Sequence, residues 1–341
     1  MKSIIILFLT ILLTFSFSQD SIPNEFHYSR STHFGITFGG ACGFGLYQAC
    51  GAGDHNYEGE FGTLCDAFCK AYPSLCEDPA GYTYRGNYAA PSGNYYTQHW
   101  DTLEGDKDNY LSCGECFEVY KTKDDGSDFK PGEEGYQPPI ILSIIDSCPC
   151  AANPQWCCGE KDDCQSGSYL KYACPLPEGS THLDLSDVAM ARLQTGSSNG
   201  NMEAGLIPNK YRRVPCPKLG NMYIWLLDNA SQYWFSFSIV NAAGFGSIVA
   251  VEIKNGEGKW VKMIREPNDE RPQERYGVWS PPKDSGPYIV PLDIRITDGS
   301  GATVVAEKAI KSLTPPADSI KGYYYIDIGV NFPEIPIPDP E

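Results

Sequence analysis

The chain has 341 residues, 14 cysteines and a formal net charge of −17 at pH 7. No basic cluster is longer than the Arg212-Arg213 pair. Nucleic acids and anionic membranes are bound through concentrated positive charge, so both are excluded as partners, whereas neutral polymers remain possible.

Residues 1–18 have the pattern of a secretory signal peptide. Lys2 precedes an almost unbroken apolar run from Ile4 to Phe17, which ends in small residues, so cleavage is expected near Ser18 or Gln19. A membrane anchor is the alternative, but the run is shorter than the ~20 residues of a spanning helix. We therefore predict a secreted, extracellular protein with about 320 residues in its mature form, enough for two domains.

The cysteines predict a disulfide framework, because their number is even and they lie in a secreted, loop-rich region. Zinc is the alternative for pairs such as Cys113 and Cys116, but no matched set of Cys and His repeats the spacing of a zinc finger, so no metal is expected. Cys65 and Cys69 share a predicted helix face, where β-carbons are ~5–6 Å apart. A disulfide needs ~4 Å, so each is expected to pair elsewhere. The predicted disulfide cysteines are Cys42, Cys50, Cys65, Cys69, Cys76, Cys113, Cys116, Cys148, Cys150, Cys157, Cys158, Cys164, Cys174 and Cys216.

The mature chain has two parts of different character. Residues 26–216 are rich in Gly, Tyr and Cys, with polar loops and short apolar strands. Residues 217–333 contain about seven β-type runs without cysteine, which predicts an antiparallel sandwich. The last residues, 334–341, are Pro-rich and acidic and are predicted to form an extended tail. The one N-glycosylation sequon begins at Asn229.

Asp184 is a candidate for carbohydrate chemistry, since glycoside hydrolysis usually uses two opposed carboxylates. It lies just before a predicted helix that Ser186 caps and whose first turn holds Asp187, where the helix dipole favours an anion. From spacing alone, Asp184 is equally well explained as a polar residue that starts the helix. The GSSNG segment at 196–200 matches an esterase motif, but it follows a helix where that motif needs a strand, so we ascribe it to chance.

Four segments in fixed order carry a resemblance to a known family. They are THFGITFGGACGFG (32–45), CGECFEV (113–119), STHLDLS (180–186) and GLIPNKYRRVPC (205–216). Together they resemble the first domain of expansins, which are secreted wall-loosening proteins, and the β-rich remainder resembles the cellulose-binding domain of expansins. The resemblance implies a mainly all-β protein: a six-stranded double-psi β-barrel with short helices, as in family-45 endoglucanases, followed by an immunoglobulin-like antiparallel β-sandwich.

The resemblance also implies a polar groove on the barrel. Asp184 matches the catalytic acid of the endoglucanases, and Thr32 matches the threonine that precedes their second carboxylate. The position of that carboxylate holds Ile36, so the hydrolytic partner of Asp184 is missing, as it is in expansins. Asp146 corresponds to a second polar aspartate of the groove and is expected near Asp184.

Two features of the groove stay open. A substitute base is conceivable on a long loop that carries Asp101, Asp106 and Asp108. Cys148 occupies the place of a groove tyrosine of bacterial relatives, and Trp156 either supplies an aromatic ring in its stead or has a structural role beside its cysteine neighbours.

In the second domain, the aromatic platform of the family maps onto Tyr233 and Trp234. The nearest ungapped position for a third ring holds Asn268, and Tyr276 and Trp279 are the alternatives after a short insertion. Strict strand alternation would put Tyr233 and Trp234 on opposite faces, so both can face a glucan only if the strand twists or bulges. Trp234 is the safer assignment, and a buried core position is the alternative for Tyr233.

These observations predict a secreted monomer of the cell wall or extracellular matrix that binds cellulose or a related β-glucan. The predicted action is non-hydrolytic disruption of contacts between polysaccharide chains, without a cofactor. The enzyme alternative is a weak endoglucanase or lytic transglycosylase on the same barrel. A third class, small barwin-like proteins with this barrel, lacks the aromatic-bearing second domain.

Overall fold

The structure is a computed structural model that describes most of the chain after residue 24. It covers residues 22, 25–35, 40–50, 59–78, 84–92, 113–148, 154–157, 181–255, 258–266, 276–317, 319–320 and 322–339. Several sequence predictions lie outside these residues: the signal peptide 1–18, Ile36, the loop aspartates Asp101, Asp106 and Asp108, Asn268, and the cysteines Cys150, Cys158, Cys164 and Cys174. In the described part of the chain, no helix is long and apolar enough to cross a membrane.

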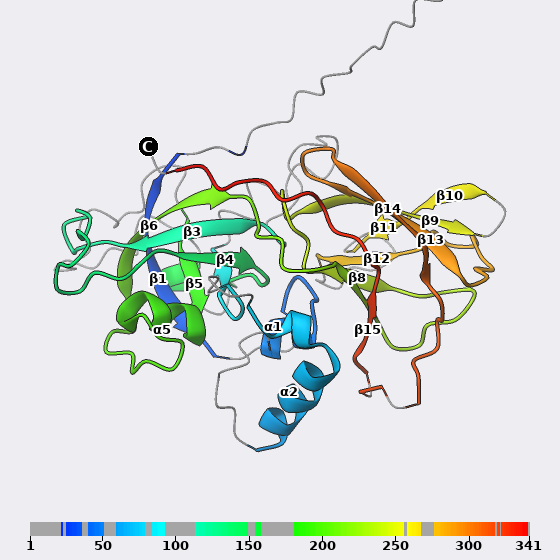
Figure 1. Ribbon diagram of the computed structural model, residues 1–341, viewed down its shortest axis with the longest axis horizontal. Coiled ribbons are helices and arrows are strands. Elements are labelled where there is room, and N and C mark those ends of the chain that lie inside the picture. The colour runs from blue at the N-terminus through cyan, green and yellow to red at the C-terminus, as the bar shows by residue number, and fades with distance from the viewer. Residues whose placement is uncertain are drawn as a thin grey trace, which may run out of the picture.

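Six strands close into a barrel in the first part of the chain (Figure 1), in the order β1-β5-β2-β4-β3-β6. The pairs β1–β5 and β2–β4 are parallel and the other four are antiparallel, as expected for the predicted double-psi β-barrel. The strands are β1 (His27–Phe34), β2 (Tyr88–Pro91), β3 (Cys116–Lys121), β4 (Ile140–Ile144), β5 (Leu183–Ser186) and β6 (Ile207–Val214).

The barrel core is filled by alternate residues of these strands and closed at one end by a helix. Leu183 and Leu185 of β5 point inward, and the period of two therefore turns Asp184 outward. Helix α5 (Asp187–Thr195) begins as predicted: Ser186 Oγ accepts a hydrogen bond from Ala189 N. The helix ends at Gly196, so the GSSNG segment follows a helix and is not a nucleophile turn.

Disulfides fix the helices and loops around the barrel. The described bonds are Cys42–Cys113, Cys50–Cys65, Cys69–Cys76, Cys116–Cys216 and Cys148–Cys157. Cys65 and Cys69, one turn apart on α2, each pair elsewhere as predicted. The remaining short helices are α1 (Leu46–Cys50), α2 (Gly59–Ala71), the 3-10 helix η1 (Pro73–Leu75) and α4 (Pro154–Cys157).

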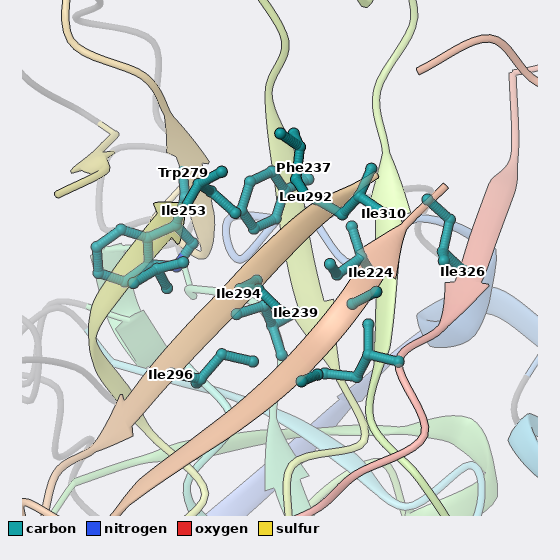
Figure 2. Packing of buried hydrophobic residues seen from close by; sticks show 14 of the residues in the cluster. Ile224, Phe237, Ile239, Ile253, Trp279, Leu292, Ile294, Ile296, Ile310 and Ile326 are labelled. Atoms are coloured by element: carbon teal, nitrogen blue, oxygen red, sulfur yellow. The ribbon is translucent and has the colours of Figure 1, made fainter. Parts of the chain in front are cut away.

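The second part of the chain is a β-sandwich of two antiparallel sheets, as predicted. One sheet has the order β10-β9-β13-β14 and the other β11-β12-β8-β7-β15. Its core is rich in Ile, Leu and Phe from both sheets, and Figure 2 shows these side chains packed between the strands. The strands are β7 (Tyr223–Leu226), β8 (Phe237–Val240), β9 (Ile248–Asn255), β10 (Lys259–Lys262), β11 (Ile264–Arg265), β12 (Val278–Ser280), β13 (Leu292–Asp298), β14 (Thr303–Ile310) and β15 (Tyr324–Asp327).

Barrel and sandwich meet in a common apolar cluster, which we call the boundary cluster. Side chains near α1 and α2, such as Phe44 and Phe68, pack there with Tyr223, Val240 and Tyr325 of the sandwich. The two parts are thus joined by a buried core as well as by the connecting chain.

The segment after β15 returns to the barrel. Figure 1 shows it in red, running from the sandwich back across the barrel strands. Phe332 is buried in the sandwich core, Ile337 packs against a small cluster that includes Val214 and Cys216, and Pro338 accepts a 2.7 Å hydrogen bond from Arg212 Nη2. The predicted extended tail therefore lies on the protein, because its apolar side chains and a carbonyl find partners there.

Candidate functional site

The candidate polar site is centred on Thr32 and Asp184, which lie opposite each other on the parallel strands β1 and β5. Thr32 Oγ1 donates a 2.6 Å hydrogen bond to Asp184 Oδ1. Burial raises the pKa of Asp184 above its usual value, and the hydrogen bond from Thr32 opposes this change. Asp184 is partly exposed, so this carboxylate can still meet a ligand.

A buried histidine extends this hydrogen bond into the protein. His182 Nε2 lies 2.9 Å from Thr32 Oγ1, and the imidazole has no exposed surface. Burial, followed by the positive charge of Arg30, lowers the pKa of His182 to about 3, so the ring is neutral at ordinary pH. Thr32 has one hydroxyl proton, and it donates this proton in the hydrogen bond to Asp184. Thr32 Oγ1 therefore accepts a hydrogen bond from the Nε2–H of His182, so that a chain of hydrogen bonds runs from His182 through Thr32 to Asp184.

A second carboxylate lies close to Asp184. His33 Nδ1 is 2.6 Å from Asp187 Oδ1, and the two side chains are 30% and 33% exposed. The charge of His33 lowers the pKa of Asp184, and the charge of Asp187 raises it. Both side chains are therefore close enough to Asp184 to interact with it electrostatically. From its sequence, Asp187 was expected only to favour the helix dipole. The signal for its place in this site is its position three residues after Asp184, together with His33 directly after Thr32.

Asp146 lies near the same group, as predicted, since its charge also raises the pKa of Asp184. One of its oxygens is already used by the protein: Oδ1 accepts hydrogen bonds from Ala41 N at 2.7 Å and Ser147 N at 2.8 Å. Asp146 therefore fixes the chain that follows β4.

Aromatic side chains border this polar group. Trp156 and Phe34 pack against a small cluster of Ala90, Cys148 and Cys157, and the Trp156 ring lies over His182. Cys148, which stands where bacterial relatives have a groove tyrosine, is thus part of a disulfide, and Trp156 lies beside this disulfide.

A separate cleft of about 610 Å³ lies at the C-terminal end of α5 and is lined by residues such as Phe129 and Gln194. None of the residues around Asp184 lines it. This cleft is therefore separate from the candidate site, which consists of Asp184 and the residues around it at the N-terminal end of α5.

In the sandwich, Tyr233 lies on the surface. It is 66% exposed, and Trp234 is partly exposed. Residues 231–234 form a tight turn closed by backbone hydrogen bonds between Ser231 and Trp234, and β8 begins only at Phe237. Side chains were expected to alternate strictly between the two strand faces from Tyr233 onward, and this is wrong. Tyr233 belongs to the turn and not to the strand, so it does not share the face on which Phe235 and Phe237 are buried.

The structure contradicts a platform role for Trp279. Its side chain is 3% exposed and packs in the sandwich core between the sheets (Figure 2). Arg265 covers the ring at 4.4 Å from its centroid. Because this ring is buried in the sandwich core, it stabilises the domain and cannot lie on a polymer surface.

Tyr276 and Asn229 have different surroundings. Tyr276 packs against the boundary cluster, and its backbone N–H donates to Ala41. Asn229 is exposed at a turn with φ of 68°, which suits a glycosylation site, and the glycan stays a prediction.

Known proteins resemble this chain. Residues 227–310 match the expansin C-terminal domain. Putative expansin-A30 of Oryza sativa subsp. japonica is 30% identical over 158 residues, which cover 46% of this chain and 49% of the rice protein. The chain spans about half the length of such plant relatives.

Two solved structures align with large parts of this chain. A mutant expansin of Clavibacter michiganensis in complex with cellohexaose has a TM-score of 0.45 and 18% identity, over 85% of this chain and 93% of that chain. The endoglucanase Cel45A of the blue mussel Mytilus edulis has a TM-score of 0.26 and 21% identity, over 56% of this chain and 79% of that chain. The resemblance to expansins that the four sequence motifs indicated is confirmed by the matching domain and the plant relatives.

Proposed function

The chain is a relative of the expansins, and on that premise we propose that it binds cellulose or a related β-glucan and loosens the wall or extracellular matrix without hydrolysis. The sandwich holds the polymer, and the barrel groove competes for hydrogen bonds between neighbouring chains. The protein acts outside the cell as a monomer and needs no cofactor.

The observation that carries this proposal is the Thr32–Asp184 pair with its buried support. A carboxylate fixed by one hydrogen bond keeps further lone pairs for sugar hydroxyls, and hydrogen bonds to a charged acceptor are stronger than those between neutral groups. Such contacts can replace hydroxyl contacts between glucan chains while no covalent bond changes.

The lack of hydrolysis rests on the missing base. Ile36 has no titratable group, and Asp187 is already bonded to His33 at 2.6 Å. An inverting hydrolase needs a carboxylate free to take a proton from water.

Tyr233 supports the binding role of the sandwich. An aromatic ring on a pyranose hides apolar C–H surface, and ~50 Å² at ~25 cal/mol per Å² corresponds to about 1 kcal/mol for each ring. After the cost of association, a few such contacts give an affinity of about micromolar or weaker.

The second candidate is a weak endoglucanase or lytic transglycosylase on the same barrel. The raised pKa of Asp184 favours it, because a general acid must hold its proton near the working pH. A loop carboxylate such as Asp101 would then be the base.

The decisive experiment compares the wild-type protein with Asp184→Asn, which keeps the side-chain volume and removes the charge. Three quantities are measured: the weakening of a cellulose paper strip under load, retention on insoluble cellulose, and new reducing ends from soluble β-glucan. Asp124→Asn, at an exposed position of the β3–β4 loop, is the charge-matched control.

We expect the wild type and the control to bind and weaken the strip without new reducing ends. Asp184→Asn should bind equally well and leave the strip intact. Reducing ends that the wild type releases and Asp184→Asn does not would establish the enzyme instead, and an active Asp184→Asn variant would remove Asp184 from the mechanism.

A further inference from the structure

The one N-glycosylation sequon of the chain lies in the same loop as Tyr233. It is Asn229-Ala230-Ser231, between β7 and β8. Asn229 is exposed, and Tyr233 is 66% exposed. Four residues of chain span at most ~14 Å, so a glycan on Asn229 begins within that distance of Tyr233.

Hydrogen bonds across the loop make it bulge at Asn229. At the base of the loop, Leu227 N donates a 2.9 Å hydrogen bond to Ser236 O, and nearer the tip the backbones of Ser231 and Trp234 are paired. Three residues of the first arm thus lie opposite a single residue of the second, so the first arm bulges away from its partner. Asn229 lies in the middle of this bulge with φ of 68°, a conformation that Asn tolerates better than most residues.

Ser231 belongs both to the sequon and to the turn that exposes Tyr233. Its Oγ accepts hydrogen bonds from Tyr233 N at 3.3 Å and from Trp234 N at 3.2 Å. A neighbouring loop also holds the tip of the hairpin, because Tyr288 N donates a 2.6 Å hydrogen bond to Gln232 O. The attachment point of a glycan and the Tyr233 ring are therefore held close together on one fixed hairpin.

A glycan at this position affects contact with an insoluble polymer. An N-glycan is a bulky, hydrophilic group, and a branched chain of several sugars is long enough to reach Tyr233 from Asn229. Tyr233 can stack on a polymer only if the flat polymer surface reaches the ring, and a group that projects beside the ring holds this surface away. The loss of one stacked ring corresponds to about fivefold weaker binding.

We propose that an N-glycan on Asn229 covers Tyr233, so that occupancy of the sequon sets how strongly the sandwich binds an insoluble β-glucan. This inference rests on the proposed function, in which Tyr233 contacts the polymer, and adds a means of regulating that contact. A glycan that serves only solubility or folding would leave cellulose binding unchanged, and the experiment separates these two roles.

The first measurement compares the full-length wild-type chain with and without its glycan. The protein is secreted from a eukaryotic host, and mass spectrometry of its peptides measures the occupancy of Asn229. Release with peptide N-glycosidase should raise the binding constant on insoluble cellulose by about fivefold or more. The Asn229→Asp variant has the same amino-acid sequence as the released protein, because the enzyme converts the asparagine to aspartate, and it should bind equally well.

A glycan at a distant position is the matched control. Asp125→Asn creates a sequon with Ser127 in the β3–β4 loop, which Figure 1 shows at the end of the barrel away from the sandwich. The hydroxyl residue again closes a local turn, since Ser127 Oγ donates a 2.6 Å hydrogen bond to Asp125 Oδ1. Combined with Asn229→Asp and glycosylated in this loop, the chain should bind cellulose as strongly as Asn229→Asp alone.

Tyr233→Ala tests whether the glycan acts through this ring. In the Tyr233→Ala chain, release of the glycan should change the binding constant by less than about twofold, because the contact that the glycan blocks is already absent. The effect of Tyr233→Ala itself should accordingly be measured in protein without the glycan.

The outcomes separate this inference from the proposed function. Equal cellulose binding with and without the glycan, an unoccupied Asn229 in the secreted protein, or the same gain on release in the Tyr233→Ala chain would overturn the regulatory role alone. If the control glycan in the β3–β4 loop weakens binding as much as the glycan on Asn229, the effect is a general one and the inference is likewise wrong. Should the released wild-type chain not bind cellulose, both proposals are wrong.

Discussion

The hydroxyl of Tyr325, on the last strand of the sandwich, donates a 2.7 Å hydrogen bond to the carbonyl oxygen of Phe44 in the cysteine-rich part of the chain. The same hydroxyl accepts a 3.1 Å hydrogen bond from Tyr47 N. Gly45 lies between these two residues, and a β-carbon there would come within 2.6 Å of the Tyr325 oxygen. The two domains thus meet through a buried polar contact that requires close approach of the backbone.

Tyr325→Phe should therefore lower the free energy of unfolding by about 2 kcal/mol, because it leaves two buried backbone groups without their partner. Denaturant unfolding followed by near-UV circular dichroism measures this loss. Tyr324→Phe, at a partly exposed neighbour, is the control and should change stability by less than about 0.5 kcal/mol. Equal stability of Tyr325→Phe and the wild type would show that the contact does not hold the domains together.

The pH dependence of stability should reveal the buried His182. Its folded-state pKa of about 3 lies below the unfolded value of about 6.5, so the unfolded chain binds an extra proton between these two values. This difference removes stability as the pH falls from 6.5 towards 3, by an amount on the order of 4 kcal/mol.

His182→Gln keeps a donor for Thr32 and cannot titrate, so its unfolding free energy should fall less steeply with acid than that of the wild type. Denaturant midpoints at pH 7, 5.5 and 4.5 give the comparison. Parallel curves for the two proteins would mean that His182 is not held neutral in the folded state.

Tyr233 and Trp279 should respond in opposite ways to replacement by alanine. Tyr233→Ala removes an exposed ring, so stability should stay within about 0.5 kcal/mol while cellulose retention falls by about fivefold. Trp279→Ala empties part of the sandwich core and should cost about 3–5 kcal/mol. Thermal unfolding and binding isotherms on the same samples separate the two effects, and a stable Trp279→Ala variant would argue against its buried position.

Removal of residues 335–341 should destabilise the barrel. The deletion exposes the cluster against which Ile337 packs. It also removes the Pro338 carbonyl that accepts a hydrogen bond from Arg212, whose side chain is fully buried and also pairs with Glu118. We expect a loss of about 1–3 kcal/mol in unfolding free energy. Asp339→Asn, an exposed change in the same segment, is the control, and a truncated protein as stable as the control would show that the segment is not anchored.

Local pattern by itself determined much of this protein. The period of two in Leu183-Asp184-Leu185 turns the carboxylate out of the barrel, and Ser186 caps the next helix, since both features depend only on neighbouring backbone geometry. The helical spacing of Cys65 and Cys69 likewise excluded a bond between them, and motif order identified the expansin relationship.

Only the tertiary structure decided which distant groups meet. His33 and Asp187 are 154 residues apart, and no local rule pairs them. The neutral state of His182 comes from burial among residues of other strands, the turn at Ser231–Trp234 brings Tyr233 to the surface, and the last residues find the barrel because their apolar side chains gain contacts there. Burial and charge at each of these positions depend on the closed barrel and the packed sandwich, which arise from chain segments that the sequence keeps far apart.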